Sequence, residues 1–323
     1  MDAIRTEALT KHYAVGFWRP RPYVALQDLS LRVAQGEVFG FLGPNGAGKT
    51  TTLKLLMQLT YPTSGRAEIL GRPVGDVQVR RRLGYLQENP CFYDHLTAEE
   101  LLEYFAGLFG LPAAERRRRA ARLLDEVGIG AERRLQLRRF SKGMLQRVGI
   151  AQALVNDPDV VFFDEPMSGL DPIGRRDIRE LILKLRDRGC TVFFSSHVLT
   201  DAEALCSRVA ILAGGRLAAE GELSDLLAFR VRGWEVVAAA VTPALLERLR
   251  GQGAVVRSRA IGGDRYAMEL PVSSAPEGLV ADLIAHGAQI VSLNPLRDTL
   301  EDLFVRKVAE TPPARRDLEA ARR

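Results

Sequence analysis

A glycine-rich loop between a strand and a helix constrains this chain more than any other feature of its sequence. The loop runs from Gly43 to Thr50 and reads Gly-Pro-Asn-Gly-Ala-Gly-Lys-Thr. The apolar run at 38–42 predicts a buried strand before it, and the segment 51–59 has the apolar spacing of a helix. Such a loop turns successive backbone N–H groups and a helix N-terminus toward one anion. The arrangement predicts a nucleoside triphosphate site in an α/β domain.

Two side chains of the loop have separate expected roles. Lys49 is expected to place its charge between the β- and γ-phosphates, and the Thr50 hydroxyl is expected to hold Mg²⁺. The alternative is a glycine-rich turn that matches the spacing by chance, and the flanking strand and helix argue against it. The residues expected to surround the phosphates are Gly43, Pro44, Asn45, Gly46, Ala47, Gly48, Lys49, Thr50 and Thr51.

Length and composition predict two domains of a globular protein. The chain has 323 residues, of which 46% are hydrophobic and 26% charged, so it is long enough to bury more than one core. It contains no run of 18 apolar residues that would span a bilayer, and its first residues lack an apolar signal region. Three cysteines without metal-ligand spacing are expected to be free thiols in a reducing cytosol.

Arginines crowd the segment 116–139, within a net charge of +5. A solvated helix face is the favoured interpretation. Contact with anionic lipid headgroups beside a membrane partner is the second. Nucleic acid is disfavoured, because no aromatic residues interleave with these arginines.

Strand and helix patterns predict the domain organisation. Residues 1–228 alternate strands and helices, which predicts a mostly parallel sheet with an inserted helical subdomain at about 90–155 and a short closing helix at 220–227. Residues 229–308 follow a βαββαβ order, with its second strand at 254–259, and predict a small α+β, ferredoxin-like domain with one appended helix. The segment 309–323 is expected to be a disordered tail.

Two further segments complete the predicted site. An apolar strand at 160–163 leads into Asp164 and Glu165, which are expected to hold Mg²⁺ and to polarise the attacking water. A strand end with two solvated acids is the plainer alternative for such a pair. Ser141 is a good N-cap, so the helix after it begins with a second anion site. A partner chain needs that site if two copies sandwich the nucleotide head to tail.

With these motifs in this order, the chain resembles the ATP-binding subunit of an ABC transporter over residues 1–225. The resemblance implies a P-loop ATPase cassette in which Ser141 and Gly143 belong to the signature, Asp171 to the D-loop, and His197 is the switch histidine that contacts the γ-phosphate. Tyr13 resembles the aromatic residue that stacks on adenine. Its competitors, which flank or lie in an insertion at 16–22, are Phe17, Trp18 and Tyr23.

The chain departs from the family pattern at two places. Its signature reads Phe-Ser-Lys-Gly-Met instead of Leu-Ser-Gly-Gly-Gln, a form that resembles a bacterial exporter-type branch. Counting from Gly84, the family's Mg²⁺-sensing glutamine falls on Glu88, while Gln87 takes a position often held by proline. Both remain candidates, and the spacing favours Glu88.

The resemblance implies the ATP-binding and hydrolysing subunit of an exporter, with ATP and Mg²⁺ as ligands. The implied partners are a transmembrane permease and a second ATPase subunit, in a homodimer or a heterodimer, with no nucleic acid. Its implied location is peripheral, at the cytoplasmic face of the cell membrane. A soluble ABC ATPase acting on ribosomes or nucleic acid is the alternative from another class, and an importer subunit is disfavoured by the signature.

Overall fold

The computed structural model describes residues 1–16, 21–227, 231–273, 275–297 and 299–311. The chain forms two compact units. The first comprises Met1–Leu223 together with the chain from Phe304, and the second comprises Ser224–Leu303. No helix among the described residues is long and apolar enough to cross a bilayer.

The first unit is built on a six-stranded sheet whose order is β10-β9-β3-β8-β7-β6. Its strands are parallel except for the pair β10–β9, so the expected mostly parallel sheet is present. Strands β3, β7 and β8 are buried along their whole length, which explains their continuous apolar runs. The strands are β3 (Val38–Leu42), β6 (Leu83–Leu86), β7 (Val160–Asp164), β8 (Thr191–Ser196), β9 (Arg208–Ala213) and β10 (Arg216–Glu222).

A second, antiparallel sheet lies beside it, in the order β2-β1-β4-β5. Its two long strands pair through almost their whole length. Leu29, Leu31 and Val33 alternate inward along β2 and join the core. The sequence patterns predicted one mostly parallel sheet and did not separate this second, antiparallel one. Its strands are β1 (Asp2–Val15), β2 (Arg21–Ala34), β4 (Ser64–Ile69) and β5 (Arg72–Pro73).

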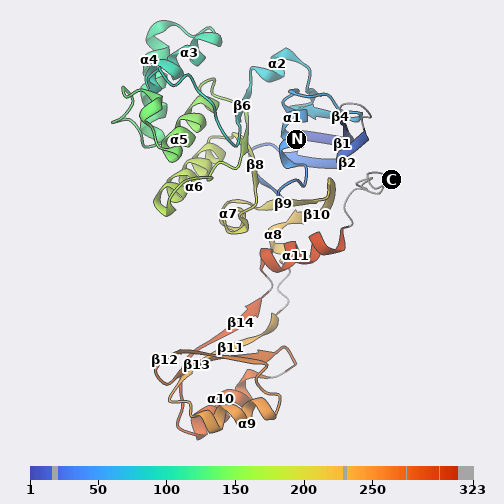
Figure 1. Cartoon of the computed structure of the whole chain (residues 1–323), viewed down its shortest axis with the longest axis vertical. Helices are drawn as coiled ribbons and strands as arrows, with labels where there is room; N and C mark the ends of the chain where they lie inside the picture. Colours follow the sequence, from blue (N-terminus) through green and yellow to red (C-terminus); the bar gives the residue numbers. More distant parts are fainter. Residues whose placement is uncertain (17–20, 228–230, 274, 298, 312–323) are drawn as a thin grey trace. The chain divides into compact units, whose positions relative to one another are not determined.

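Helices cover the parallel sheet, and a helical subdomain is inserted between β6 and β7 (Figure 1). A reciprocal capping box between Thr97 and Glu100 begins its first helix. The helices of the first unit are α1 (Lys49–Leu56), α2 (Val77–Arg80), α3 (Ala98–Leu108), α4 (Ala113–Glu126), the 3₁₀ helix η1 (Leu137–Arg139), α5 (Lys142–Ala153), α6 (Pro172–Asp187) and α7 (Leu199–Leu205).

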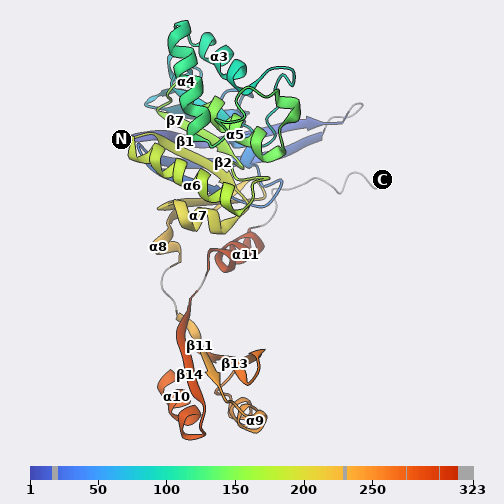
Figure 2. The same cartoon turned by 90° about the vertical axis from the view of Figure 1, so that its left-hand side faces the viewer.

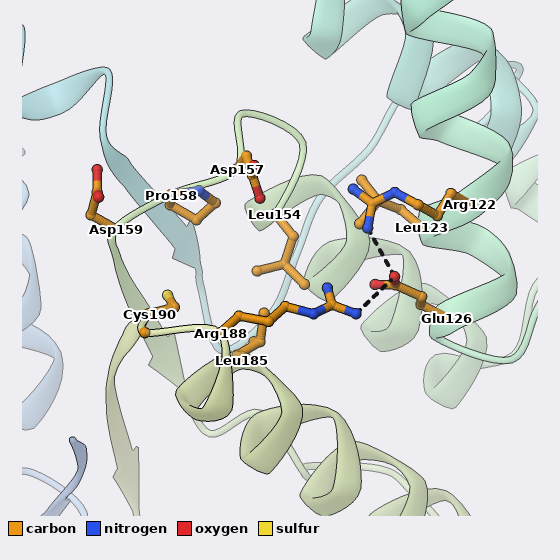
Figure 3. A pocket seen from close by; sticks show the side chains of 11 residues that line it. Arg122, Leu123, Glu126, Leu154, Asp157, Pro158, Asp159, Leu185, Arg188 and Cys190 are labelled. Atoms are coloured by element: carbon orange, nitrogen blue, oxygen red, sulfur yellow. Dashed lines mark hydrogen bonds and ion pairs between the residues drawn. The ribbon is translucent and has the colours of Figure 1, made fainter. Parts of the chain in front are cut away.

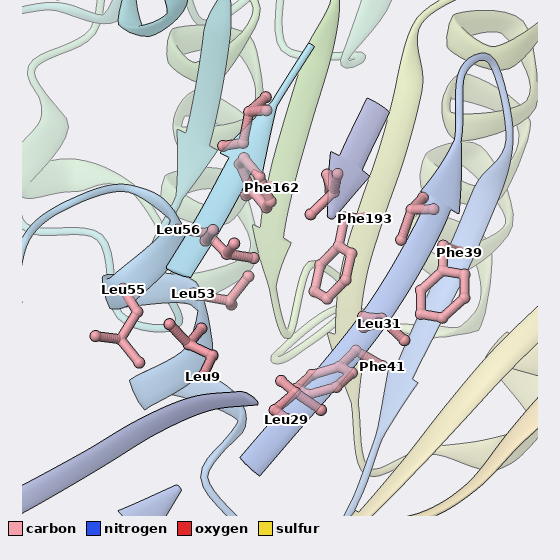
Figure 4. Packing of buried hydrophobic residues seen from close by; sticks show 14 of the residues in the cluster. Leu9, Leu29, Leu31, Phe39, Phe41, Leu53, Leu55, Leu56, Phe162 and Phe193 are labelled. Carbon is pink, nitrogen blue, oxygen red and sulfur yellow. The ribbon is translucent and has the colours of Figure 1, made fainter. Parts of the chain in front are cut away.

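A phenylalanine cluster holds the parallel sheet to the layers beside it. Phe193 lies among Phe39, Phe41 and Phe162, with ring centroids 5.2–5.7 Å apart (Figure 4). All four rings are fully buried, and each contributes roughly 2–3 kcal/mol of transfer free energy. Because these rings sit on β3, β7 and β8, the cluster fixes the three strands that end at the glycine-rich loop, Asp164 and His197.

The second unit contains a four-stranded antiparallel sheet in the order β12-β13-β11-β14. Val236, Met268 and Leu270 of the sheet pack with leucines of two helices in one buried cluster. Because both helices contribute to this one cluster, they lie on the same side of the sheet (Figure 1), and Figure 2 shows the same unit turned by 90°. The elements are β11 (Val231–Ala239), α9 (Pro243–Gly251), β12 (Arg257–Gly262), β13 (Arg265–Pro271), α10 (Pro276–Ala285) and β14 (Gln289–Arg297).

Several predicted boundaries differ from the structure. Strand β10 continues to Glu222, so the helix predicted at 220–227 shortens to α8 (Leu223–Leu226), and the unit boundary falls before the predicted 228/229. The strand predicted at 254–259 is displaced to β12, because register with β13 fixes its position. Helix α11 (Leu300–Glu310) reaches into the tail predicted from 309, and its residues from Phe304 group with the first unit. The remaining tail, 312–323, lies outside the described residues.

Candidate functional site

A cavity of about 260 Å³ opens at the carboxyl ends of β3 and β7. In sheets of this kind ligands bind at the carboxyl edge, outside the strand ends. The cavity brings together the predicted loop and the predicted acidic pair. It is lined by Tyr23, Ala25, Pro44, Asn45, Gly46, Gly48, Lys49, Thr50, Thr51, Glu88, Asp164 and Glu165.

Two glycines of the loop cannot be replaced without moving backbone. A Cβ at Gly48 would lie 2.5 Å from the carbonyl oxygen of Ala25, and its φ of +107° is one that L-residues rarely adopt. A Cβ at Gly43 would lie 2.5 Å from the carbonyl oxygen of Leu212 on β9. The glycines therefore let the loop pass tightly between β2 and β9 before α1 begins at Lys49.

Lys49 is a buried cation at the centre of this cavity. Its side chain is 7% exposed, and its Nζ donates to the carbonyl oxygen of Gly43 at 2.7 Å. The same Nζ lies 3.6 Å from Oε1 of Glu165. It also lies 3.4 Å from the carbonyl oxygen of Pro44. A buried ammonium group that lines a cavity beside a glycine-rich loop is suited to holding a polyphosphate.

Asp164 ends β7 as an almost fully buried carboxylate. Its Oδ1 accepts a short hydrogen bond from the Ser195 hydroxyl on β8, while its Oδ2 is buried and has no hydrogen-bond partner among the described residues. Burial and, to a lesser degree, the Asp164 charge raise the pKa of Tyr85 on β6 to about 12. An orphaned carboxylate oxygen facing a phosphate loop fits a bound cation.

Glu165 follows in a strained conformation that its neighbours hold in place. Its φ is +53°, in the left-handed region that side chains other than glycine seldom occupy. Its N–H donates to the Ser195 carbonyl at 3.2 Å. The buried amide of Gln146 on α5 donates to the carbonyl oxygens of Glu165 and Pro166 at 3.1 and 3.2 Å. These bonds fix the direction in which the Glu165 side chain leaves the backbone.

His197 lies on the turn after β8 and contacts the same carboxylate. Its Nδ1 is 2.9 Å from Oε2 of Glu165, and its side chain is 54% exposed. The Ser196 hydroxyl accepts from the N–H of Val198 at 2.9 Å and shapes the turn. Glu165 is thus held between Lys49 on one side and His197 on the other.

The signature and D-loop residues lie together but outside this cavity. Ser141 caps α5 by accepting from the N–H of Met144 at 3.2 Å, and Asp171 caps α6 by accepting from the N–H of Gly174 at 2.8 Å. Gly143 approaches the D-loop closely, since a Cβ there would lie 3.3 Å from the carbonyl oxygen of Gly169. Both capping residues are exposed, so they are accessible to another molecule.

The competing candidates for the adenine and metal contacts lie in different places. Tyr23 lines the cavity, whereas Tyr13, its cross-strand partner, instead receives the Lys11 ammonium group over its ring at 4.9 Å. Phe17 and Trp18 lie outside the described residues. Glu88 lines the cavity, and Gln87 beside it does not.

A second cavity, of about 190 Å³, lies at the opposite, amino ends of β7 and β8. Its main charged groups are already paired, because Glu126 of α4 accepts from Arg122 at 2.8 Å and from Arg188 at 3.3 Å (Figure 3). These two ion pairs of Glu126 connect the helical subdomain to Arg188 at the end of α6. The cavity lies far along the strands from the loop, and none of the predicted site residues lines it.

Fold and site together define a P-loop nucleotide-binding protein. A family profile described as ABC transporter matches residues 26–168. An uncharacterized ABC transporter ATP-binding protein of Synechocystis sp. is 44% identical over 311 residues, which cover 96% of this chain and 85% of that protein. The chain belongs to the family of ABC transporter ATP-binding proteins, and it is an ABC ATPase.

Two further comparisons bear on activity and assembly. The bacitracin transport ATP-binding protein of Bacillus licheniformis is 40% identical over 220 residues, covering 67% of this chain and 69% of that one. A solved dimeric ATP-binding cassette in a post-hydrolysis state with ADP and Pi is 28% identical, with a TM-score of 0.64 over 68% of this chain and 98% of that chain. The chain is thus homologous to exporter ATPases and to dimeric cassettes.

Two residues of the site were not found from the sequence. Ser195 binds Asp164 and the Glu165 backbone, and Gln146 binds the carbonyls after Glu165. A serine at the end of a buried apolar strand and a glutamine on the inner face of a helix are the signals that mark them. Both are polar residues at positions where burial without a partner is costly.

Proposed function

We propose that the chain hydrolyses ATP at a site completed by a second ATPase subunit and thereby drives a membrane permease that exports its substrate. The observation that carries the proposal is the contact of the buried Glu165 carboxylate with the buried Lys49 on one side and the half-exposed His197 on the other, beside the glycine-rich loop. It combines a fixed cation with an oriented carboxylate and an imidazole. These are the groups that phosphoryl transfer to water requires.

Each side chain has one step in the proposed reaction. Lys49 and the loop N–H groups hold the polyphosphate of ATP. Glu165 accepts a proton from water as the water oxygen attacks the γ-phosphorus and the bond to the ADP oxygen breaks. His197 orients Glu165 from the side away from Lys49 and reaches the γ-phosphate. Tyr23 replaces Tyr13 as the preferred partner for the adenine ring, because it lines the cavity.

Mg²⁺ fits the residues present. The orphaned Oδ2 of Asp164 and the Thr50 hydroxyl would hold it, with Glu88 lining the same cavity. No group of three acidic, histidine or cysteine ligands occurs among the described residues, as expected for Mg²⁺ held by few protein oxygens and the phosphates. The ion would neutralise charge on the phosphate oxygens.

The exposed signature supports a site shared between two chains. Ser141, Gly143 and Asp171 lie outside the cavity of their own chain and present helix N-termini to solvent. The similarity to a dimeric cassette with ADP and Pi favours a dimer in which these residues face the partner's nucleotide. Either a homodimer or a heterodimer satisfies this geometry.

An exposed aromatic cluster on the helical subdomain is the proposed permease contact. Tyr93 and Tyr104 are 57% and 49% exposed, and their ring centroids lie 6.4 Å apart. Leu108 and Phe109, at the end of α3, are also exposed apolar residues. The chain would thus sit peripherally at the cytoplasmic face of the membrane, and its similarity to a bacitracin transport protein favours export.

The second unit is proposed to be a ferredoxin-like accessory domain. Its βαββαβ order and the strand order β12-β13-β11-β14 support that assignment. Its boundary with the cassette is proposed to lie at 223–228.

Glu165→Gln tests the proposed function directly. The amide keeps the shape of the side chain and removes the base, so turnover should fall by at least about 10²-fold while ATP binding persists. Light scattering with ATP should then show a stable dimer of the variant. Turnover near that of the wild type would contradict the role of Glu165, and a monomer at saturating ATP would contradict the shared site.

A further inference from the structure

Asp201 is a buried carboxylate that the proposed reaction does not use. Its side chain is only 4% exposed, and its Oδ2 has no hydrogen-bond partner among the described residues. Two guanidinium groups face it from α6, Arg175 at 3.9 Å and Arg179 at 3.6 Å. A carboxylate withdrawn from water in this way costs stability unless the charges around it repay the desolvation.

The three charged residues join two helices that begin at the site. Helix α6 starts from the D-loop cap Asp171, and Arg175 and Arg179 lie one and two turns further along it. Helix α7 starts two residues after His197 and carries Asp201 in its first turn. The ion pairs thus connect the helix behind the D-loop to the turn that carries His197.

Stability alone does not account for this cluster. Burial raises the pKa of Asp201 above its ordinary value, and the two arginines and His197 only partly oppose that rise. The folded state therefore disfavours the charge, and a neutral side chain of the same shape would be tolerated at least as well. The distances of 3.6 and 3.9 Å also leave the pairs without close hydrogen bonds.

We propose that Asp201 is a positioning residue for ATP hydrolysis, which through Arg175 and Arg179 holds the His197 turn in register with the D-loop helix. The inference rests on the proposed role of Glu165 and His197. If the turn moves, Nδ1 of His197 leaves its contact 2.9 Å from Glu165, and the carboxylate loses the group that orients it. Nucleotide binding by the loop, on the other side of Glu165, is unaffected.

Asp201→Asn in the full chain distinguishes a role of Asp201 in positioning His197 from a purely structural role. We expect kcat for ATP to fall by about tenfold or more, since small misplacements of a catalytic group are costly. KM for ATP and the affinity for a non-hydrolysable ATP analogue should stay within about twofold, and Tm should be unchanged or higher. Asp201→Glu should recover part of kcat by restoring the charge.

The matched control is Glu180→Gln, which removes an exposed ion pair with Arg176 on the same helix and should leave kcat unchanged. A kcat for Asp201→Asn within twofold of wild type would overturn the inference, as would a parallel loss of analogue affinity. If Asp201→Asn fails to fold, the double variant Arg175→Gln, Arg179→Gln takes its place with the same expected loss of kcat.

Glu165→Gln, assayed alongside, distinguishes the two proposals. ATP turnover by Glu165→Gln near that of the wild type would contradict the proposed hydrolytic site. An inactive Glu165→Gln with a fully active Asp201→Asn would overturn the positioning role alone.

Discussion

Gln146 is expected to stabilise the turn that carries Glu165, although it does not line the cavity at the glycine-rich loop. Its amide is 1% exposed and donates to the carbonyl oxygens of Glu165 and Pro166 at 3.1 and 3.2 Å. Gln146→Met keeps the length of the side chain and removes both donors. The substitution therefore tests how strongly the fold holds Glu165 in its positive-φ conformation.

The expected cost follows from the bonds that are lost. Each neutral hydrogen bond contributes about 1 kcal/mol net, and a buried carbonyl left without a partner costs about 1–3 kcal/mol. The Glu165 oxygen also accepts from the N–H of Ser168 at 3.0 Å, so it is not left unpaired. We therefore expect a loss of about 2 kcal/mol, which for a domain of this size lowers Tm by about 4–8 °C.

Thermal unfolding of the full chain measures this effect, with Gln152→Met on the same helix as control. Gln152 is only half-buried and should tolerate methionine with little change in Tm. kcat for Gln146→Met should also fall, because Glu165 loses part of its support. Equal Tm values for the two variants, or an unchanged kcat, would refute the role given to Gln146.

Three further predictions concern the loop, the thiols and the buried acid. Gly48→Ala should destabilise the protein more than Gly46→Ala. Both glycines have a positive φ, but only a Cβ at position 48 would meet backbone, 2.5 Å from the carbonyl oxygen of Ala25. Equal melting temperatures of the two variants would contradict this steric clash. Of the three cysteines, Cys91 is exposed, whereas burial raises the pKa of Cys190 to about 12 and that of Cys206 still further. A thiol reagent should therefore label Cys91 quickly in the native protein and all three cysteines after denaturation. The native Cys91→Ser variant should not be labelled quickly, and rapid labelling of it would contradict the burial of the other two thiols. Burial raises the pKa of Asp201 above 3.8, so this carboxyl group loses its proton at a lower pH in the unfolded chain than in the folded one. The free energy of unfolding should therefore fall as pH rises from the unfolded pKa through the folded pKa of this group, and Asp201→Asn should remove that part of the pH dependence. Parallel curves of stability against pH for the two proteins would contradict the effect of burial.

The glycine-rich loop and the acidic pair could be located from the sequence because each consists of contiguous residues. A strand, a glycine-rich turn and a helix N-terminus follow one another from 38 to 59, so local spacing alone carries the signal. The parallel core was predictable for a similar reason, since β3, β7 and β8 are buried on both faces and read as unbroken apolar runs.

The parts that were missed depend on contacts between distant residues. Strands β1 and β2 form one long antiparallel pair, in which Arg21 and Pro22, expected in an insertion, already belong to β2. Tyr23, one of the competing aromatic residues, follows them and lines the cavity. Strand β12 begins at Arg257 because its partner β13 sets the register. Asp201 and its arginines are separated along the chain, so only the packing of α7 on α6 brings them together.

The most direct test of the shared site is a mixture of two inactive variants. Lys49→Ala removes the cation that holds the phosphates, and Ser141→Arg places a bulky side chain on the exposed signature without touching the cavity of its own chain. In a heterodimer of the two, both defects fall in one site, and the other site is intact.

The measurement is steady-state ATPase activity of each variant alone and of the mixture, with heterodimers demonstrated by co-purification through two different tags. Each variant alone should be nearly inactive, and Ser141→Arg should still bind ATP as a monomer. The mixture should recover a substantial share of the activity expected from one intact site per heterodimer. Activity no higher than that of either parent, with heterodimers present, would contradict independent sites built from Lys49 of one chain and Ser141 of the other.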